Sequence, residues 1–458
     1  MILSWRETLS GIVKPDERLP WGQTLAMGFQ HVLAMFGATV VAPIIMGFDP
    51  NLAILFSGIG TLIFFAFVGG AVPSYLGSSF AFIAPVAAVT GTAAAAGAGN
   101  GIPLALGGIV AAGVVYALIG LIVHLTGAGW IDRLMPPLVT GAVVAIIGLN
   151  LAGAARNLAG FDPLIAAITV LAIFIVGLLT TGIFSRLPIL IGGVIGYVAA
   201  LLLGGTSVAG RSYLGTTVHG VDLEPIRAAP WFGVPAFVAP EFNGGAMALI
   251  APVAIVLVAE NLGHVKAVSA LTGQNLTPFL GRAFIGDGVA TIVAGLRGGT
   301  GVTTYAENIG VMAVTRVYST LVFLIAGIIA IIFGLSPKFG AMIGSIPQGV
   351  LGGVTTVLFG LIAVTGARIW VDNRVDFTRA VNLFVAAATL IIGAADYTVT
   401  IGGFTMNGIT LGTFAAIVLY QLFKGAPTQE DFAIVGDEAE ARAELRAGVG
   451  GRARGEAG

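Results

Sequence analysis

Residues 302–316 read VTTYAENIGVMAVTR, and the apolar run within them, 302–315, is too short to cross a bilayer as a regular helix. A crossing helix needs about 20 apolar residues at about 1.5 Å per residue. A second short run, 77–92, contains the sequence SSFAF from Ser78. Non-helical backbone at membrane depth is tolerated only where it is buried in protein or faces a wet cavity. The two short runs therefore predict backbone N–H groups that are available to a ligand near the middle of the membrane.

The composition of the chain excludes a soluble enzyme and a disordered protein. Of its 458 residues, 57% are apolar and 9% are charged, whereas a soluble domain has about 25% charged residues. The apolar runs have helix length and lack the alternation of an outer-membrane barrel. We therefore predict an all-α polytopic membrane protein. The chain has no cysteine and a net charge of −1, so we expect no thiolate metal site and no nucleic-acid partner.

The apolar runs divide into fourteen predicted transmembrane segments. They are 24–46, 52–70, 77–92, 103–126, 136–155, 163–183, 187–204, 246–268, 280–297, 302–315, 317–336, 347–366, 378–396 and 405–424. The polar stretch 205–245 is expected to form one long extracellular loop, and the charged tail 425–458 to be partly disordered.

The distribution of basic residues predicts the orientation of the chain. With the N-terminus inside, five of the 21 Lys and Arg residues fall outside and the other sixteen fall in the cytoplasm. The outside residues are Arg156, Arg211, Arg227, Arg297 and Lys338. The positive-inside rule therefore places both termini in the cytoplasm of a multi-pass protein of the cell's inner membrane. The first 23 residues show no secretory signal pattern.

The two halves of the chain resemble each other weakly. Ser78-Ser79-Phe80-Ala81 corresponds to Thr303-Thr304-Tyr305-Ala306 with an offset of about 225, and Gln30-His31 to Glu260-Asn261 with one of about 230. Pro136, Val139 and Gly141 match Pro347, Val350 and Gly352 in the same order. Since seven is odd, two seven-span halves would have opposite orientations, which is an inverted repeat typical of secondary transporters.

Four ionisable side chains lie deep in the predicted segments, and such residues are functional candidates because they are costly in lipid. They are His31, Glu260, His264 and Glu307. Glu260 and His264 share a helix face at i and i+4. Carboxylates and imidazoles together suggest proton handling and a ligand rich in N–H donors. Structural roles remain open: a packing Glu–His pair, a hydrogen-bonded His31, and Glu307 as a helix-dipole partner. The role of Asp287 is undecided.

The sequence resembles the nucleobase–ascorbate transporters, also called nucleobase:cation symporters of the second class. Glu307 to Arg316, ENIGVMAVTR, looks like their signature, which runs Gln/Glu-Asn-x-Gly, four residues and Thr. Gln30-His31 resembles the motif of the family's first span, and Glu260 to His264 that of its eighth. The resemblance covers about residues 20–425.

The resemblance implies fourteen spans in two inverted repeats, with short antiparallel strands in spans 3 and 10 and with dimers that meet through gate domains. Each domain is expected to be formed by two stretches of the chain, one from each repeat. The expected order along the chain is a cytoplasmic N-terminus (1–23), the first core stretch (24–126), the first gate stretch (127–204), the extracellular loop (205–245), the second core stretch (246–336), the second gate stretch (337–424) and the tail (425–458).

The resemblance also implies residue roles. Glu260 and Glu307 would accept hydrogen bonds from ring N–H groups of a nucleobase. The backbone N–H groups of Phe80 and Ala306 would donate to its carbonyls. Phe80 and Tyr305 would pack near the ring. For proton coupling, His264 would support Glu260, and His31 would join the polar network.

In having Glu at position 307 the sequence resembles uracil permeases, whereas xanthine carriers usually have Gln there. We therefore expect a proton-coupled uracil symporter that needs no cofactor or metal. Ala306 and Phe359 depart from the family's pattern, since relatives often have Gly at the first position and Tyr at the second.

The alternatives are a xanthine or purine permease and an anion carrier of the sulfate-permease type. The anion carrier is disfavoured because no Lys or Arg is expected beside the two carboxylates. An enzyme is disfavoured because no catalytic motif is found, and a channel because inverted repeats with interrupted helices are typical of carriers.

Overall fold

The structure is a computed structural model that describes residues 4–9, 11–95, 99–182, 184–206, 210–213, 215–401 and 404–426. Most of the predicted tail, from residue 427, therefore lies outside the described residues. Long helices dominate, and their boundaries follow proline and glycine. In α2 (Pro50–Val68), the Asp49 side chain caps the first turn, Pro50 is the first helical residue and Gly69 ends the helix with a φ of 64°.

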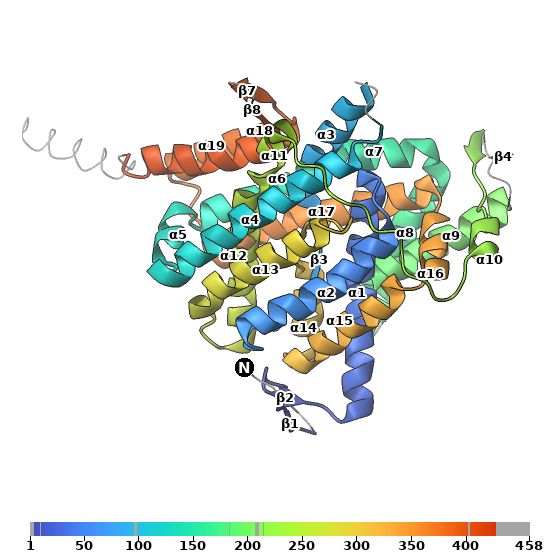
Figure 1. Ribbon diagram of the computed structural model, residues 1–458, viewed down its shortest axis with the longest axis horizontal. Coiled ribbons are helices and arrows are strands. Elements are labelled where there is room, and N and C mark those ends of the chain that lie inside the picture. The colour runs from blue at the N-terminus through green and yellow to red at the C-terminus, as the bar shows by residue number, and fades with distance from the viewer. Residues whose placement is uncertain are drawn as a thin grey trace, which may run out of the picture.

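One group of helices packs around a central row in which α4, α13, α2 and α15 lie side by side (Figure 1). We refer to it as the first helix group. It comprises α1 (Trp21–Met46), α2, α3 (Ile83–Ala95), α4 (Ile102–Thr126), α11 (Gly244–Ile250), α12 (Val253–Thr272), α13 (Leu280–Gly295), α14 (Ala306–Thr315), α15 (Thr320–Gly334) and α16 (Pro337–Gly344). Helices α15 and α16 meet at a bend of 82°.

The second helix group is built around α17, which packs on α6, α7 and α8. It comprises α6 (Pro137–Asn150), α7 (Ala152–Phe161), α8 (Pro163–Leu179), α9 (Pro188–Gly204), α17 (Gln348–Asp372), α18 (Ala380–Ala394) and α19 (Gly408–Phe423). The two groups touch where α12 packs on α6 and α19, and where α1 packs on α9 and α17.

Shorter elements lie before, between and within the two groups. They are β1 (Arg6–Glu7), β2 (Glu17–Arg18), β3 (Leu76–Ser78), η1 (Phe80–Phe82), α5 (Gly129–Leu134), η2 (Phe184–Arg186), β4 (Arg211–Tyr213), β5 (Thr216–Val218), α10 (Glu224–Ala228), η3 (Thr277–Phe279), β6 (Val302–Thr304), β7 (Val399–Ile401) and β8 (Phe404–Met406). The predicted loop thus holds two strands and a helix turn. From α10 it continues as an extended segment across the first group to α11 (Figure 1).

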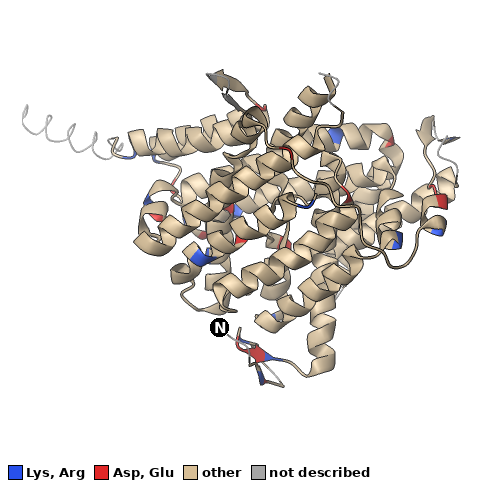
Figure 2. Cartoon of the chain, in the orientation of Figure 1, with Lys and Arg blue, Asp and Glu red and all other residues tan. Residues whose placement is uncertain are grey.

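The membrane character of the fold is clear, and the number of crossings stays a prediction. Within the described residues, six helices are long and apolar enough to cross a membrane, or seven if the bent pair α15–α16 is one span. Shorter apolar helices occupy five of the other predicted segments, and α13 and α14 lie in the remaining two, 280–297 and 302–315. Most charged residues lie at helix ends and in connections, with a few acidic ones inside the helical body (Figure 2).

Strands β3 and β6 form an antiparallel pair, with Leu76 opposite Thr304 and Ser78 opposite Val302. Their residues are buried. This pair confirms the expectation of short antiparallel strands in the two interrupted segments. The segments are not regular helices because each begins as an extended strand and becomes helical only after Ser79 or Tyr305.

Helices α4 and α13 approach each other through glycines, as is common for helices packed in lipid. A Cβ atom on Gly288 would lie 2.5 Å from the backbone N of Ala117, and one on Gly113 would lie 2.8 Å from the backbone O of Gly288. Neither backbone can move without separating the helices.

Gly288→Val is therefore expected to lower the melting temperature of the purified protein, because overpacking costs about 1–3 kcal/mol or more. Gly153→Val on α7 is the matched control, because no atom lies within 4 Å of a Cβ added there. Equal melting temperatures for Gly288→Val and the wild type would contradict the close packing.

Candidate functional site

The site is built around the β3–β6 pair, where two helical segments begin. Strand β3 leads into η1 at Phe80, and β6 leads through Tyr305 into α14 at Ala306. Further backbone bonds extend the pair, from Ser79 N to Gly301 O (2.9 Å) and from Tyr305 N to Tyr75 O (3.1 Å). The first N–H groups of a helix have no partner within the helix. The amides of Phe80 and Ala306 therefore lie where backbone N–H groups and the positive ends of helix dipoles favour an acceptor.

Each strand is held by a threonine of the preceding long helix. Thr61 on α2 accepts a hydrogen bond from Leu76 N at 2.9 Å and donates one to Leu76 O at 3.4 Å. Thr291 on α13 makes the same two bonds with Val302, at 3.2 Å from N and 3.3 Å to O. These bonds satisfy strand groups that a two-stranded pair leaves open. They also keep the two helix starts in fixed positions.

The two predicted glutamates lie on neighbouring helices. Glu307 is in the first turn of α14, and Glu260 is in the middle of α12, which packs on α14. Both side chains are partly buried. The Oε2 atom of Glu260 is buried without a hydrogen-bond partner among the described residues. A carboxylate oxygen without a partner suits a ligand that brings N–H donors.

Glu307 lines a cavity of about 320 Å³ between the two helix groups. The other lining residues come from α1, α14 and α17 and from the segment 185–190 at the start of α9. The cavity walls are mainly apolar, with a few polar groups. That combination is typical of small-molecule sites.

His31 is fully buried and bonded to the residue after Glu307. The Nδ2 atom of Asn308 lies 3.0 Å from both Nδ1 and the backbone O of His31. Since the carbonyl must accept, the Asn308 amide donates both hydrogens, so Nδ1 is an acceptor and Nε2 carries the proton of a neutral ring. The ring packs on Phe323 at 4.5 Å between centroids. His31 Nε2 and Asn308 Oδ1 are buried without partners within the described ranges of the chain.

His264 bonds to the strand pair. Its Nδ1 lies 2.8 Å from Thr304 Oγ1, which donates at 3.5 Å to Asn261 Oδ1. The prediction that His264 supports Glu260 stays a prediction, and among the described residues no hydrogen bond joins the two side chains. The i and i+4 spacing places both on one helix face, and β6 packs against α12 there. Thr304 is therefore within reach of the imidazole.

Asp287 is a buried member of the same network, and the sequence left its role undecided. The Nδ2 atom of Asn261 donates to Asp287 Oδ2, and Tyr116 OH donates to the same oxygen at 3.3 Å. Asp287 is 0% exposed and lies between two glycines of α13. A carboxylate within an apolar span was the available signal. Its partners come from α4 and α12, and no sequence pattern shows that they converge.

The aromatic residues of the site hold its backbone. The Tyr305 ring covers Gly77, and its hydroxyl donates to Ser78 O at 2.8 Å and accepts from Thr39 at 3.2 Å. Phe80 packs edge-to-face on Phe359 of α17 at 5.5 Å between centroids. Tyr305 thus joins α1 to the strand pair, while Phe80 contacts the second helix group.

Arg186 is the residue that the sequence analysis missed. We expected no Lys or Arg beside the two carboxylates, yet Arg186 lines the same cavity as Glu307. Its Nε atom is buried without a partner among the described residues. The sequence placed Arg186 at a cytoplasmic segment end, and that position says nothing about which helix lies opposite. The charge objection to an anion ligand is therefore weaker than expected.

Known proteins are similar to the chain over most of its length. The family model Xan_ur_permease, described as "Permease family", matches residues 22–402. The "Putative pyrimidine permease RutG" of Escherichia coli (strain K12) is 58% identical over 419 residues, covering 91% of this chain and 92% of that protein. The "Uracil permease" of Escherichia coli (strain K12) is 39% identical over 422 residues, covering 89% and 93%. The "Uracil permease" of Bacillus subtilis (strain 168) is 37% identical over 429 residues, covering 89% and 94%.

Solved structures share the fold at low identity. The transmembrane domain of the cyanobacterial bicarbonate transporter BicA superposes with a TM-score of 0.62 at 16% identity, covering 86% of this chain and 96% of that one. The murine anion transporter Slc26a9 in its inward-facing state gives a TM-score of 0.61 at 12% identity, covering 88% and 68%. These similarities concern the fold alone.

Proposed function

The chain belongs to the nucleobase–ascorbate transporter family of permeases, and from that membership we propose that it imports uracil together with protons. The observation that carries the proposal is that Glu307, in the first turn of the helix that follows β6, lines a cavity between the two helix groups. A carboxylate and free backbone amides together match a ring with adjacent N–H and C=O groups. The names of the relatives, uracil and pyrimidine permeases, point to the same substrate.

In this proposal, Glu260 and Glu307 accept the ring N–H groups of uracil. The amides of Phe80 and Ala306 donate to its carbonyl oxygens. Phe80 and Tyr305 set the shape of the site, which fits their packing against Phe359 and Gly77. Binding then depends on charge-assisted hydrogen bonds, which are stronger than neutral ones.

We further propose that His31, His264 and Glu260 carry out proton coupling. His31 is tied to Asn308, the neighbour of Glu307, and His264 is tied to β6. A proton gained by either imidazole changes which of its nitrogens can accept a hydrogen bond. Proton binding would thereby alter the position of α14 or β6, and with it the site.

Alternating access would come from movement of a core domain against a gate domain, within fourteen spans of two inverted repeats. The separate packing of the two helix groups supports this division. The matching bonds of Thr61 and Thr291 to the two strands support the repeat. The proposal includes a homodimer formed through the gate domains, in the inner membrane with both termini in the cytoplasm.

Ligand-induced thermal stabilisation of the purified protein tests the substrate. A ligand that binds only the folded state raises the melting temperature. At a ligand concentration of 100 times its Kd, the free energy of unfolding rises by about 2.7 kcal/mol. Uracil should stabilise the protein, while xanthine, uric acid and sulfate should not; thymine would show whether a 5-methyl group is accepted. Stabilisation by xanthine alone would favour the purine-permease alternative.

Replacement of Arg186 distinguishes a uracil carrier from an anion carrier. If uracil binds through the two carboxylates, Arg186→Gln should retain uracil stabilisation within a few fold in affinity, because uracil is neutral. If the ligand is an anion, the same change removes the cavity's cation and costs about 1.5–3 kcal/mol. Loss of sulfate stabilisation in Arg186→Gln, with none by uracil in the wild type, would contradict the uracil proposal.

A further inference from the structure

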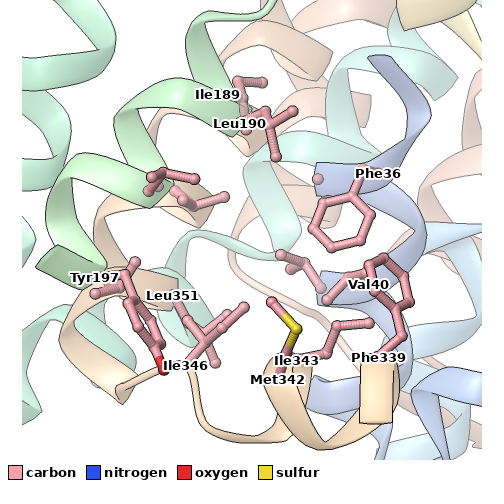
Figure 3. Close-up of a pocket in the computed structure, with 16 residues that line it drawn as sticks. Phe36, Val40, Ile189, Leu190, Tyr197, Phe339, Met342, Ile343, Ile346 and Leu351 are labelled. Atoms are coloured by element: carbon pink, nitrogen blue, oxygen red, sulfur yellow. The ribbon is translucent and has the colours of Figure 1, made fainter. Parts of the chain in front are cut away.

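A second cavity, of about 280 Å³, lies between α1, α9, α16 and α17 (Figure 3). We refer to it as the apolar crevice. Its lining side chains carry no charge, and Tyr197 is the polar one among them. The Tyr197 hydroxyl is already 2.9 Å from Ser345 Oγ. In Figure 3, Phe36 and Val40 face Tyr197 and Leu351 across the opening.

The crevice reaches the apolar surface of the protein. Val194 and Met342 line it and are 54% and 48% exposed. The α9 surface beyond them carries Val198 and Leu202, which are also exposed. On a membrane-spanning helix such a surface faces lipid. The mouth of the crevice therefore opens towards hydrocarbon.

Water does not fill such a space well, because a buried water needs two to four polar partners and the walls offer almost none. An empty crevice would deprive its lining atoms of dispersion contacts. Association between apolar surfaces in lipid depends on packing of this kind, since lipid tails are as apolar as the side chains. A hydrocarbon chain is the filler that the surroundings supply.

The crevice also adjoins the cavity that Glu307 lines. Gly37, Ile189 and Leu190 line both cavities. A Cβ atom on Gly37 would lie 2.9 Å from Ile189 Cγ2, so the Ile189 side chain closes directly over the α1 backbone. This contact lies between the apolar crevice and the cavity that Glu307 lines.

We propose that the apolar crevice binds one acyl chain of a membrane phospholipid, inserted between α1 and α9 up to the contact of Gly37 with Ile189. The bound acyl chain acts as a spacer between the two helix groups. Any movement that brings α1 closer to α9 has to expel it. This binding site depends on the membrane location of the protein and not on the identity of the transported substrate.

The test uses the full chain in vesicles of phosphatidylethanolamine and phosphatidylglycerol, in which a small share of the lipid carries a photoreactive diazirine in one acyl chain. After illumination, mass spectrometry maps the labelled residues. Labels on Ile343 and Leu351, which are 2% and 5% exposed, are expected alongside labels on the lipid-facing Leu202. Labels on Leu202 without labels in the crevice would overturn the proposal, and would mean that the crevice is closed or covered by a second copy of the chain.

A variant in which a side chain fills the crevice provides a second test of the proposal. Gly193 lines the crevice, and a Cβ atom there would meet Val354 at an ordinary 3.5 Å, so Gly193→Phe should place its ring in the crevice. Labelling of Ile343 and Leu351 should be lost in this variant, while Leu202 stays labelled. Gly360→Phe on α17 is the matched control, since no atom lies within 4 Å of its added Cβ. Unchanged crevice labelling in Gly193→Phe would contradict the site, and the wild-type map decides the question if that variant does not fold.

Discussion

Replacing Glu307 or Glu260 with alanine is expected to abolish uracil binding while the protein stays folded. Each carboxylate is proposed to accept a ring N–H, and a hydrogen bond to a charged group contributes about 1.5–3 kcal/mol, or roughly 10- to 150-fold in Kd. The substrate N–H would also be left unpaired, which increases the loss. Folding should survive because Glu260 Oε2 has no partner to lose among the described residues, and a partly buried charge without a partner does not stabilise a fold.

Uracil-dependent thermal shift and equilibrium binding are the measurements. Glu241→Ala, an exposed glutamate of the extended loop segment, is the matched control and should bind as the wild type does. Glu307→Gln separates shape from charge, because it keeps a carbonyl acceptor and removes the negative charge. It should bind uracil more weakly than the wild type and better than Glu307→Ala. Wild-type affinity in either alanine variant would refute the site assignment.

The central features of the site could be predicted from the sequence because each is costly in a membrane. Glu260, Glu307 and His31 are ionisable groups within apolar runs. The two interrupted segments are too short for regular helices, and the structure pairs them as strands. In both cases a local pattern is sufficient, since the penalty in lipid applies to the segment itself.

The contacts between segments could not be predicted in the same way. The partner of His264 is Thr304, 40 residues along the chain. Asp287 is held by Tyr116 and Asn261 from two other helices. Such bonds depend on the relative rotation and depth of packed helices, which apolar runs do not specify. Arg186 shows the same limit, because its place on the cavity wall depends on how η2 lies against α1 and α14.

His31→Gln is expected to impair transport much more than binding. His31 is not one of the proposed ligand contacts, so its removal leaves them in place. In the structure Nδ1 accepts a hydrogen bond from Asn308. A protonated ring has no acceptor nitrogen, so protonation would break this bond and leave Asn308, the residue next to Glu307, held to His31 only through the backbone O. Coupling free energies between two ligands are typically about 1–3 kcal/mol, or roughly 5- to 150-fold. We therefore expect gradient-driven uptake to decrease by roughly 5- to 150-fold.

Uracil uptake into vesicles with and without an inward proton gradient measures this coupling, and thermal shift measures binding in the same preparation. His124→Gln is the matched control, because His124 is exposed in the last turn of α4 and should leave both quantities unchanged. In His31→Gln, uptake should no longer respond to the gradient, while the uracil-dependent shift persists. Uptake that follows the gradient as in the wild type would exclude His31 from the coupling path and leave His264 and Glu260 as the remaining proton carriers in the proposal. A loss of binding equal to the loss of transport would instead assign His31 a positioning role, in which its bond to Asn308 holds the start of α14, and Glu307 with it, in place.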